Sequence, residues 1–486
     1  MPKLVAIGDS LTQGVQSGSV FKTGLSFPAL IAESMGSNVP KNFRVPSFPG
    51  SGLPFNIECF LRSMRQKLGR DIEGIEWAEL LYHLSGFVDD IEDLYERGAG
   101  SKPAAYTGLY HNLAVAGFRV YDSFKVNAKY CVCQIMDKEG WIQDDFLGLP
   151  SAPMYRIAQR VLNPGQRRYQ NSWTQIDNLK ALNKPEDPVE NLILFLGAND
   201  CLGTLKDLEI RDMAENPPSD PQERRKRYNL TSAEVFREDY RRMVVQISSV
   251  ISDTTRVFVG NVPHVTIAPI TQGISGDDDS VNNDGYFPYY GPFYATQEAF
   301  NPRWDPHLTG TEAQRIDKRI DEFNAIIGEL IQEQGERWQV VDICALLDDL
   351  AVKRNSETDC PTEVLENFFQ RRNRSDHPLL AANLNPTPSV LRFESSQRGR
   401  ISGGLFSLDC FHPTTIGYGL IAEEFLREME NVNVENADPT RLNWRQIIKR
   451  DSLIQNPPAL WDDILEVADA HPRLTSLIYR ILESVT

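Results

Sequence analysis

Three residues that could together catalyse acyl transfer lie at opposite ends of the sequence. Ser10 stands in a Gly-Asp-Ser-Leu turn directly after the apolar run 4–7, and Asp409 precedes His412 by three positions. An imidazole can take the proton of a serine hydroxyl and so make the serine a nucleophile, and a carboxylate on the same loop can fix the tautomer of the ring. Each piece alone is more often a helix cap or a turn, so the hypothesis depends on finding the pieces together.

Acyl transfer also needs hydrogen-bond donors for the oxyanion, and two segments between these ends could supply them. Asn199 follows the apolar run 192–196 in Gly-Ala-Asn-Asp, and its side-chain amide is a donor. Gly117 follows the short stretch 112–116, and a glycine lets a backbone N–H approach a ligand closely. The sequence contains no Gly-x-Ser-x-Gly motif, the competing signature of a serine nucleophile, which favours Ser10 as the sole nucleophile.

These four segments, in this order, resemble the sequence blocks of the SGNH, or GDSL, hydrolase family. The resemblance implies that Ser10 is the nucleophile and that His412 is the general base, oriented by Asp409. It also implies an oxyanion hole that consists of the backbone N–H groups of Ser10 and Gly117 and the side-chain amide of Asn199. The activity implied is the hydrolysis of carboxylic esters.

The sequence departs from the family pattern at two places. Phe118 stands where a small residue is usual after the glycine, and Cys410 and Phe411 stand where a Gly-Ile type pair is common. These departures concern the shape of the pocket more than its chemistry. Asp200, which completes the family's Gly-x-Asn-Asp, is implied to be structural.

The resemblance implies an α/β fold with a flavodoxin-like three-layer α/β/α sandwich around a parallel five-stranded sheet. Short apolar runs such as 4–7, 192–196 and 256–260 are typical of buried parallel strands. Since the nucleophile and its base must meet, we expect one hydrolase domain over residues 1–434, followed by a C-terminal helical extension over residues 435–486. Five βα units need only about 150 residues, so we expect large insertions at about 37–103, 122–168, 206–228, 268–308 and 355–400.

Charge and composition exclude several classes of function. The formal net charge of −17 argues against binding to nucleic acid or to anionic membrane surfaces. No apolar stretch approaches the roughly 20 residues of a transmembrane helix, and no leader precedes the first strand. We therefore expect a cytoplasmic protein, or a secreted one if a leader has been removed. The seven cysteines are interpreted as free thiols; the pair Cys131 and Cys133 has no second ligand pair for zinc, and we expect no metal and no cofactor.

Four further features of the sequence concern the fold or the site. His264 follows the run 256–260 and could line a pocket, whereas His377 lies directly after an aspartate and is a less suitable base than His412. Thr231 opens a Thr-Ser-Ala-Glu capping box, which predicts the start of a helix there. The charged segment 206–228 predicts a solvated excursion.

Several activities remain open within this family. A small-molecule ester is favoured as substrate, but the aromatic segment 286–294, interpreted as a lid or as simple packing, keeps a lipid ester open. The alternatives are a lipase or phospholipase, or an acyltransferase that acts on lipid acyl groups. A second alternative is a non-catalytic ligand- or carbohydrate-binding protein with the same fold. The sequence indicates no oligomeric state.

Overall fold

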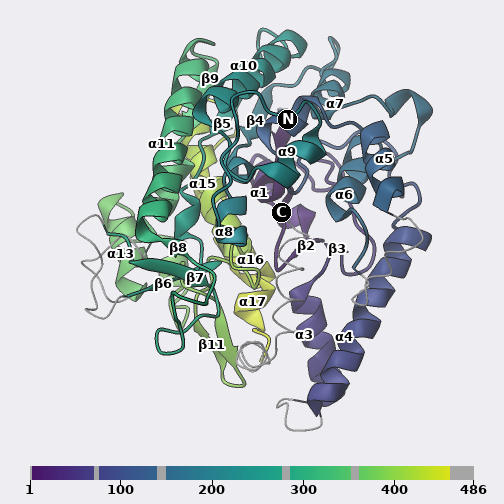
Figure 1. The fold of residues 1–486 in the computed structure, drawn as a ribbon. Helices are drawn as coiled ribbons and strands as arrows, with labels where there is room; N and C mark the ends of the chain where they lie inside the picture. Colours follow the sequence, from purple (N-terminus) through teal and green to yellow (C-terminus); the bar gives the residue numbers. More distant parts are fainter. Residues whose placement is uncertain (1–2, 70–75, 139–148, 276–284, 352–360, 460–486) are drawn as a thin grey trace.

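A parallel sheet of four strands lies at the centre of the protein. The computed structural model describes residues 3–69, 76–138, 149–275, 285–351 and 361–459. The strands are β1 (Leu4–Gly8), β4 (Asn191–Phe195), β5 (Arg256–Gly260) and β9 (Trp338–Val341), in the order β1-β4-β5-β9 (Figure 1). All neighbouring pairs are parallel, so the carboxyl ends of the strands meet at one edge of the sheet. The predicted α/β fold is confirmed.

The sheet has four strands in the described residues, not the five expected, because the segment around residue 112 pairs with β1 only in part. A parallel bridge joins Ala6 to Asn112, and the Leu113 N–H donates to the Ala6 carbonyl (2.8 Å). The Val115 N–H likewise donates to the Gly8 carbonyl (3.1 Å), whereas the Ala114 N–H between them donates to the Asn112 side chain (3.1 Å). The segment therefore runs along β1 without completing a strand.

Side chains alternate between the two faces of the sheet, and each face packs against helices. On β1, Val5 and Ile7 belong to one hydrophobic cluster, whereas Leu4 and Ala6 belong to another. Because both faces are covered, the strands are apolar at almost every position. The first cluster includes residues of α7 (Gln175–Leu182), α10 (Ala233–Val250) and α11 (Gly310–Gln332); the second includes residues of α2 (Phe27–Ser34), α12 (Ile343–Asp348) and α15 (Thr415–Asn431).

The segments between these elements form further helices and small antiparallel sheets. Their bounds are β2 Ser19–Val20, β3 Leu53–Pro54, α3 Ile57–Leu68, α4 Glu76–Glu92, α5 Ala128–Lys138, α6 Pro153–Leu162, α8 Gly203–Asp207, α9 Pro221–Arg227, β6 Thr271–Ile274, β7 Tyr289–Pro292, β8 Leu308–Thr309, α13 Pro361–Arg371, α14 Pro378–Ala381, β10 Glu394–Ser396 and β11 Gly399–Ser402. Helices α3 and α4 pack side by side and extend away from the sheet (Figure 1). The aromatic segment 286–294 contributes β7, the middle strand of the sheet β6-β7-β8, so part of it is regular structure.

The charged segment 206–228 is only in part the solvated excursion that its composition predicts: Lys226 and Arg227 are exposed, but two neighbouring arginines are not. Its helix α9 packs against the protein, where Arg224 lies 3.5 Å from the centre of the Tyr121 ring. Arg225 forms an ion pair with Asp122, and the side chains are 14% and 3% exposed. The prediction was wrong for these two arginines because their partners lie about 100 positions earlier in the chain.

Helix α10 begins one residue later than the capping box predicts. Its N-cap is Ser232, whose hydroxyl accepts the Val235 N–H (3.4 Å). The hydroxyl of Thr231 donates instead to the buried Asp200 carboxylate (2.8 Å). Thr231 therefore forms a tertiary hydrogen bond instead of the helix cap that the local sequence pattern predicts.

The described part of the C-terminal extension packs against the core. It contains α16 (Trp444–Arg450) and α17 (Ser452–Gln455), and the buried Asp451 between them accepts the Ile416 N–H (2.9 Å) in the first turn of α15. The rest of the predicted helical extension, residues 460–486, lies outside the described residues. No helix in the ranges given above is long and apolar enough to cross a membrane.

Candidate active site

Ser10 is placed by a tight turn between a strand and a short helix. It is the first residue of α1 (Ser10–Gln13), which begins directly after β1 at the carboxyl edge of the sheet. Asp9 caps this helix by accepting a backbone N–H of the first turn at Oδ1 (3.0 Å). A Cβ at Gly8 would overlap the Thr12 hydroxyl, so the turn requires glycine. Strand end and cap together hold Ser10 at the sheet edge where α/β proteins bind ligands.

Asp409 and His412 lie on one loop before α15, and their side chains contact each other. Asp409 Oδ2 is 3.0 Å from His412 Nδ1, and both residues are buried. Asp409 Oδ1 accepts the backbone N–H groups of Phe411 (3.2 Å) and His412 (2.9 Å). Cys410 has a φ of +68°, the left-handed region that favours glycine, which explains why a glycine was expected there. The backbone of the loop therefore sets the geometry of the pair.

The segment that follows α1 holds this loop in place. The Gly18 N–H donates to Asp409 Oδ2 (2.6 Å), and the Tyr418 hydroxyl on α15 donates to the Val15 carbonyl (2.7 Å). These hydrogen bonds join positions 391 and 403 residues apart. These hydrogen bonds thus join the N-terminal segment to the loop of Asp409 and His412. Ser10 lies only a few residues before the residues that form them.

The environment of Asp409 favours its ionised form. Burial on its own raises the pKa of Asp409, but the charge of His412 and hydrogen bonds from His412 and Gly18 outweigh it, so that the pKa lies below its usual value. At the opposite side of the ring, His412 Nε2 is buried and has no hydrogen-bond partner among the described residues. Ser10 therefore does not hydrogen-bond to this nitrogen here; such bonds often form only when substrate binds.

The segments that carry Asn199 and Gly117 contact each other. One N–H of the Asn199 amide donates to the carbonyl of Phe118, directly after Gly117 (3.0 Å). An amide has two N–H donors, and no described residue accepts the second one. Gly117 has a φ of +79°, a conformation that glycine adopts without strain. The Asp200 carboxylate accepts the Val120 N–H (3.1 Å) and so ties the same two segments together.

Three buried polar side chains connect these segments and were not predicted from the sequence. Gln13, the last residue of α1, accepts the Ala116 N–H (2.8 Å). Asn112 donates to a carbonyl of α1 (2.8 Å), and Gln175 donates to the last carbonyl of β1 (3.0 Å). All three residues have no exposed surface. A single sequence gives no sign of such roles, because the partner groups are backbone atoms that only the tertiary structure brings near.

Two other histidines that the sequence singled out have different surroundings. His377 Nε2 lies 3.1 Å from Glu423 Oε2, so His377 belongs to a separate buried pair. His264 lies after β5 as expected, but Asp348 and Asp321 occupy its two ring nitrogens at 2.7 and 3.0 Å. Neither histidine is available to Ser10 as a base; of the three histidines that the sequence singled out, His412 is the one with a buried ring nitrogen that has no hydrogen-bond partner among the described residues.

Comparison with known proteins gives the family. The sequence model of the family described as GDSL-like Lipase/Acylhydrolase matches residues 4–425. Searches among curated proteins and among solved structures found no match. The matched range includes the whole parallel sheet, the Ser10 turn and the loop of Asp409 and His412. The chain therefore belongs to the GDSL-like lipase and acylhydrolase family, a family of hydrolases that act on esters.

Proposed function

We propose that the protein hydrolyses carboxylic esters with Ser10 as the nucleophile, His412 as the general base and Asp409 as the residue that orients the base. The observation that carries this proposal is the position of the Asp409 carboxylate between His412 Nδ1 and the Gly18 N–H, at 3.0 and 2.6 Å. A carboxylate at Nδ1 keeps the proton on that nitrogen and leaves Nε2 as the acceptor. The absence of a partner for Nε2 among the described residues supports the same role.

In the proposed mechanism, His412 Nε2 takes the proton of Ser10 as its hydroxyl oxygen attacks the acyl carbonyl. The tetrahedral intermediate then expels the alcohol, which receives the proton from His412, and an acyl group remains on Ser10. Water attacks this acyl enzyme with His412 again as base, and the carboxylic acid leaves. Asp409 stays ionised throughout and stabilises the imidazolium, in keeping with its lowered pKa.

The proposed oxyanion hole consists of the Ser10 and Gly117 backbone N–H groups and the Asn199 side-chain amide. The second N–H of Asn199 is the one directed to substrate in this proposal, since the first is held by the Phe118 carbonyl. That bond fixes the amide plane, so the donor would be oriented before the reaction begins. Donors fixed in this way stabilise negative charge as it develops on the carbonyl oxygen.

The proposal includes a flavodoxin-like core within one hydrolase domain over residues 1–434. If the segment around residue 112 is counted as a strand beside β1, the order in the sheet becomes second, first, third, fourth, fifth, as in flavodoxin-like folds. Ligands bind in such folds where the strand order reverses, which is next to the first strand. The Ser10 turn follows that strand directly.

The test is hydrolysis of p-nitrophenyl esters from acetate to palmitate by the purified chain and by Ser10→Ala. We expect activity in the first and none above background in the second, with Ser249→Ala, an exposed serine on α10, as the matched control. The preferred chain length separates small esters from lipid substrates, and product formed on an added alcohol would indicate acyl transfer. Equal, negligible rates for the chain and Ser10→Ala on all esters would favour the non-catalytic binding protein instead.

A further inference from the structure

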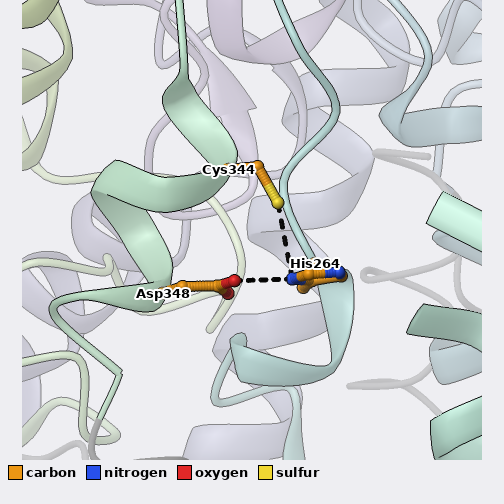
Figure 2. A group of neighbouring side chains, drawn as sticks. All are labelled: His264, Cys344 and Asp348. Carbon is orange, nitrogen blue, oxygen red and sulfur yellow. Dashed lines mark hydrogen bonds and ion pairs between the residues drawn. The ribbon is translucent and has the colours of Figure 1, made fainter. Parts of the chain in front are cut away.

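A histidine, a cysteine and an aspartate converge at the carboxyl edge of β5 and β9, in the cluster formed by His264, Cys344 and Asp348. Cys344 and Asp348 lie one turn apart on α12 and both point at His264, which follows β5 (Figure 2). His264 Nδ1 is 2.7 Å from Asp348 Oδ2 and 3.4 Å from Cys344 Sγ. Among the described residues, this is the one group of three or more His, Cys or acidic side chains whose ligand atoms lie close enough to share an ion, within 4.8 Å of one another.

Two of the three distances between these atoms are near those of a zinc site, and the third, from Cys344 Sγ to the Asp348 carboxylate, is within 4.8 Å. Zinc binds histidine nitrogen and carboxylate oxygen at about 2.0–2.2 Å and thiolate sulfur at about 2.3 Å. Tetrahedral geometry with these bond lengths places ligand atoms about 3.3–3.6 Å apart. The nitrogen and sulfur already have such a separation at 3.4 Å, and the oxygen at 2.7 Å would move outward by well under 1 Å. A mixed set of nitrogen, sulfur and oxygen atoms suits Zn²⁺, whereas Mg²⁺ and Ca²⁺ prefer oxygen alone.

The groups around the cluster orient its members as supporting residues do in metal sites. Asp321 on α11 lies 3.0 Å from the other ring nitrogen of His264, and a carboxylate at that position fixes the tautomer of a metal-bound histidine. Asn261 at the end of β5 accepts the Cys344 N–H (2.8 Å) and donates to Asp342 (2.8 Å), the N-cap of α12. These bonds fix the position of α12 relative to β5.

Two simpler interpretations account for less of the geometry. A Cys-His-Asp nucleophilic triad would use Cys344 at Nδ1 of His264 and Asp321 at the opposite nitrogen, but it gives no role to the Asp348 carboxylate, which lies 2.7 Å from Nδ1. A charged imidazolium between Asp348 and Asp321 explains the two carboxylates, but the thiol at 3.4 Å would then only share the Nδ1 N–H that already points at Asp348. A cation bound between His264 Nδ1, Cys344 Sγ and the Asp348 carboxylate accounts for the positions of all three side chains.

We propose that His264 Nδ1, Cys344 Sγ and the Asp348 carboxylate bind a zinc ion, with water as the fourth ligand. The thiol binds as a thiolate and the imidazole as its neutral form, so binding releases their protons to solvent. Thiolate and carboxylate then balance the charge of Zn²⁺, which matters because His264 and Cys344 are 6% and 7% exposed. The ion would link the segment after β5 to α12, separately from the ester-hydrolysing site.

The experiment uses the full chain freed of metal by a chelator, then titrated with Zn²⁺ in a calorimeter and heated to measure its Tm. We expect one equivalent of bound Zn²⁺ and a higher Tm, with no effect of Mg²⁺. Cys344→Ser should weaken binding by more than about 100-fold, and Asp321→Asn by about 10- to 100-fold. Cys133→Ser, at an exposed cysteine on α5, and His412→Gln, at the other buried His and Asp pair, should leave the affinity unchanged.

Co²⁺ added to the unaltered chain gives a result that does not depend on how the variants fold. We expect a thiolate-to-cobalt charge-transfer band that appears with one equivalent of Co²⁺ and disappears when Zn²⁺ is added. No bound metal, a cobalt spectrum without this band, or equal Zn²⁺ affinity in Cys344→Ser would overturn the proposal. Loss of the stoichiometric site in His412→Gln alone would also overturn it, because the ion would then bind beside Asp409.

Discussion

Replacement of Asp409 by asparagine should separate the orientation of the base from the integrity of its loop. The carboxylate accepts hydrogen bonds at both oxygens. Oδ2 accepts from the Gly18 N–H and from His412 Nδ1; Oδ1 accepts from the backbone N–H groups of Phe411 and His412 and from the Ser407 hydroxyl, which can turn to accept instead. An amide offers one oxygen and one NH₂ group, so in either orientation the NH₂ must face backbone donors. The two orientations differ in which donors lose their acceptor.

The cost of each orientation follows from the number of donors left unpaired. If the NH₂ replaces Oδ1, two backbone N–H groups lose their acceptor, at about 1–3 kcal/mol each. If it replaces Oδ2, only the Gly18 N–H does, because His412 can move its proton to Nε2 and accept at Nδ1. The second orientation is the less costly, so the Asp409→Asn chain should fold with a loss of about 1–3 kcal/mol. Its imidazole then cannot take the proton of Ser10, and kcat should fall by about 10⁴.

The assay is kcat on the p-nitrophenyl ester that the chain hydrolyses best, with the free energy of unfolding from urea titration on the same samples. Asp376→Asn, at an exposed aspartate beside His377, is the matched control and should change neither quantity. A folded Asp409→Asn variant that keeps more than a tenth of the kcat would refute the orienting role. A stability loss near twice the expected value would instead indicate that the amide adopts the other orientation.

Four further substitutions, at three residues, test other parts of the site. Asn199→Ala should lower kcat by about 10²–10³, or about 3–4 kcal/mol of transition-state stabilisation, and Asn199→Asp should lower it further because a negative charge would face the oxyanion; a change in KM alone would argue against an oxyanion role. Burial, together with the nearby charge of Asp200, raises the pKa of Asp9 to about 7, so the stability contributed by its neutral form is present below about pH 4 and is lost as the pH rises to 7. Asp9→Asn should therefore exceed the original chain in free energy of unfolding above pH 7, by no more than about 4 kcal/mol, and parallel pH profiles in urea titrations would contradict this. Gly8→Ala should abolish activity and lower the Tm, because its Cβ would overlap Thr12 and lie 2.7 Å from the Phe195 carbonyl; a Tm equal to that of the original chain would show that the turn can adjust.

The sequence predicts the strand ends well, because the chemistry of this site is local to them. Ser10 directly follows β1, Asn199 lies four residues after β4, and Asp409 lies three residues before His412 on one loop. Apolar runs bounded by Gly-Asp or Gly-x-Asn-Asp mark these positions without any knowledge of contacts. The order of the segments then adds the specificity that each short motif lacks alone.

The parts that were mispredicted or missed depend on contacts between distant residues. Thr231 fits a capping box, but its hydroxyl donates to Asp200 instead. Arg225 lies in a segment whose composition is typical of a solvated helix, but it forms an ion pair with Asp122. The buried Gln13 has no sequence signature, since its partner is a backbone N–H 103 positions away. The cluster at His264 was missed for the same reason: its cysteine lies 80 positions along the chain, far outside the spacing of known zinc motifs.

The hydrogen bond from Gly18 to Asp409 also sets when a newly made chain can first act. Its acceptor leaves the ribosome 391 residues after its donor. At roughly 5–20 residues per second, that interval is about 20–80 seconds. During this time the proposed nucleophile exists without its proposed base, so on the mechanism proposed above a growing chain hydrolyses no ester. When esterase activity is followed during synthesis, its first appearance should therefore mark the moment at which the loop of Asp409 and His412 joins the Ser10 segment. The delay after synthesis of residue 409 is the few seconds that this residue needs to leave the ribosome.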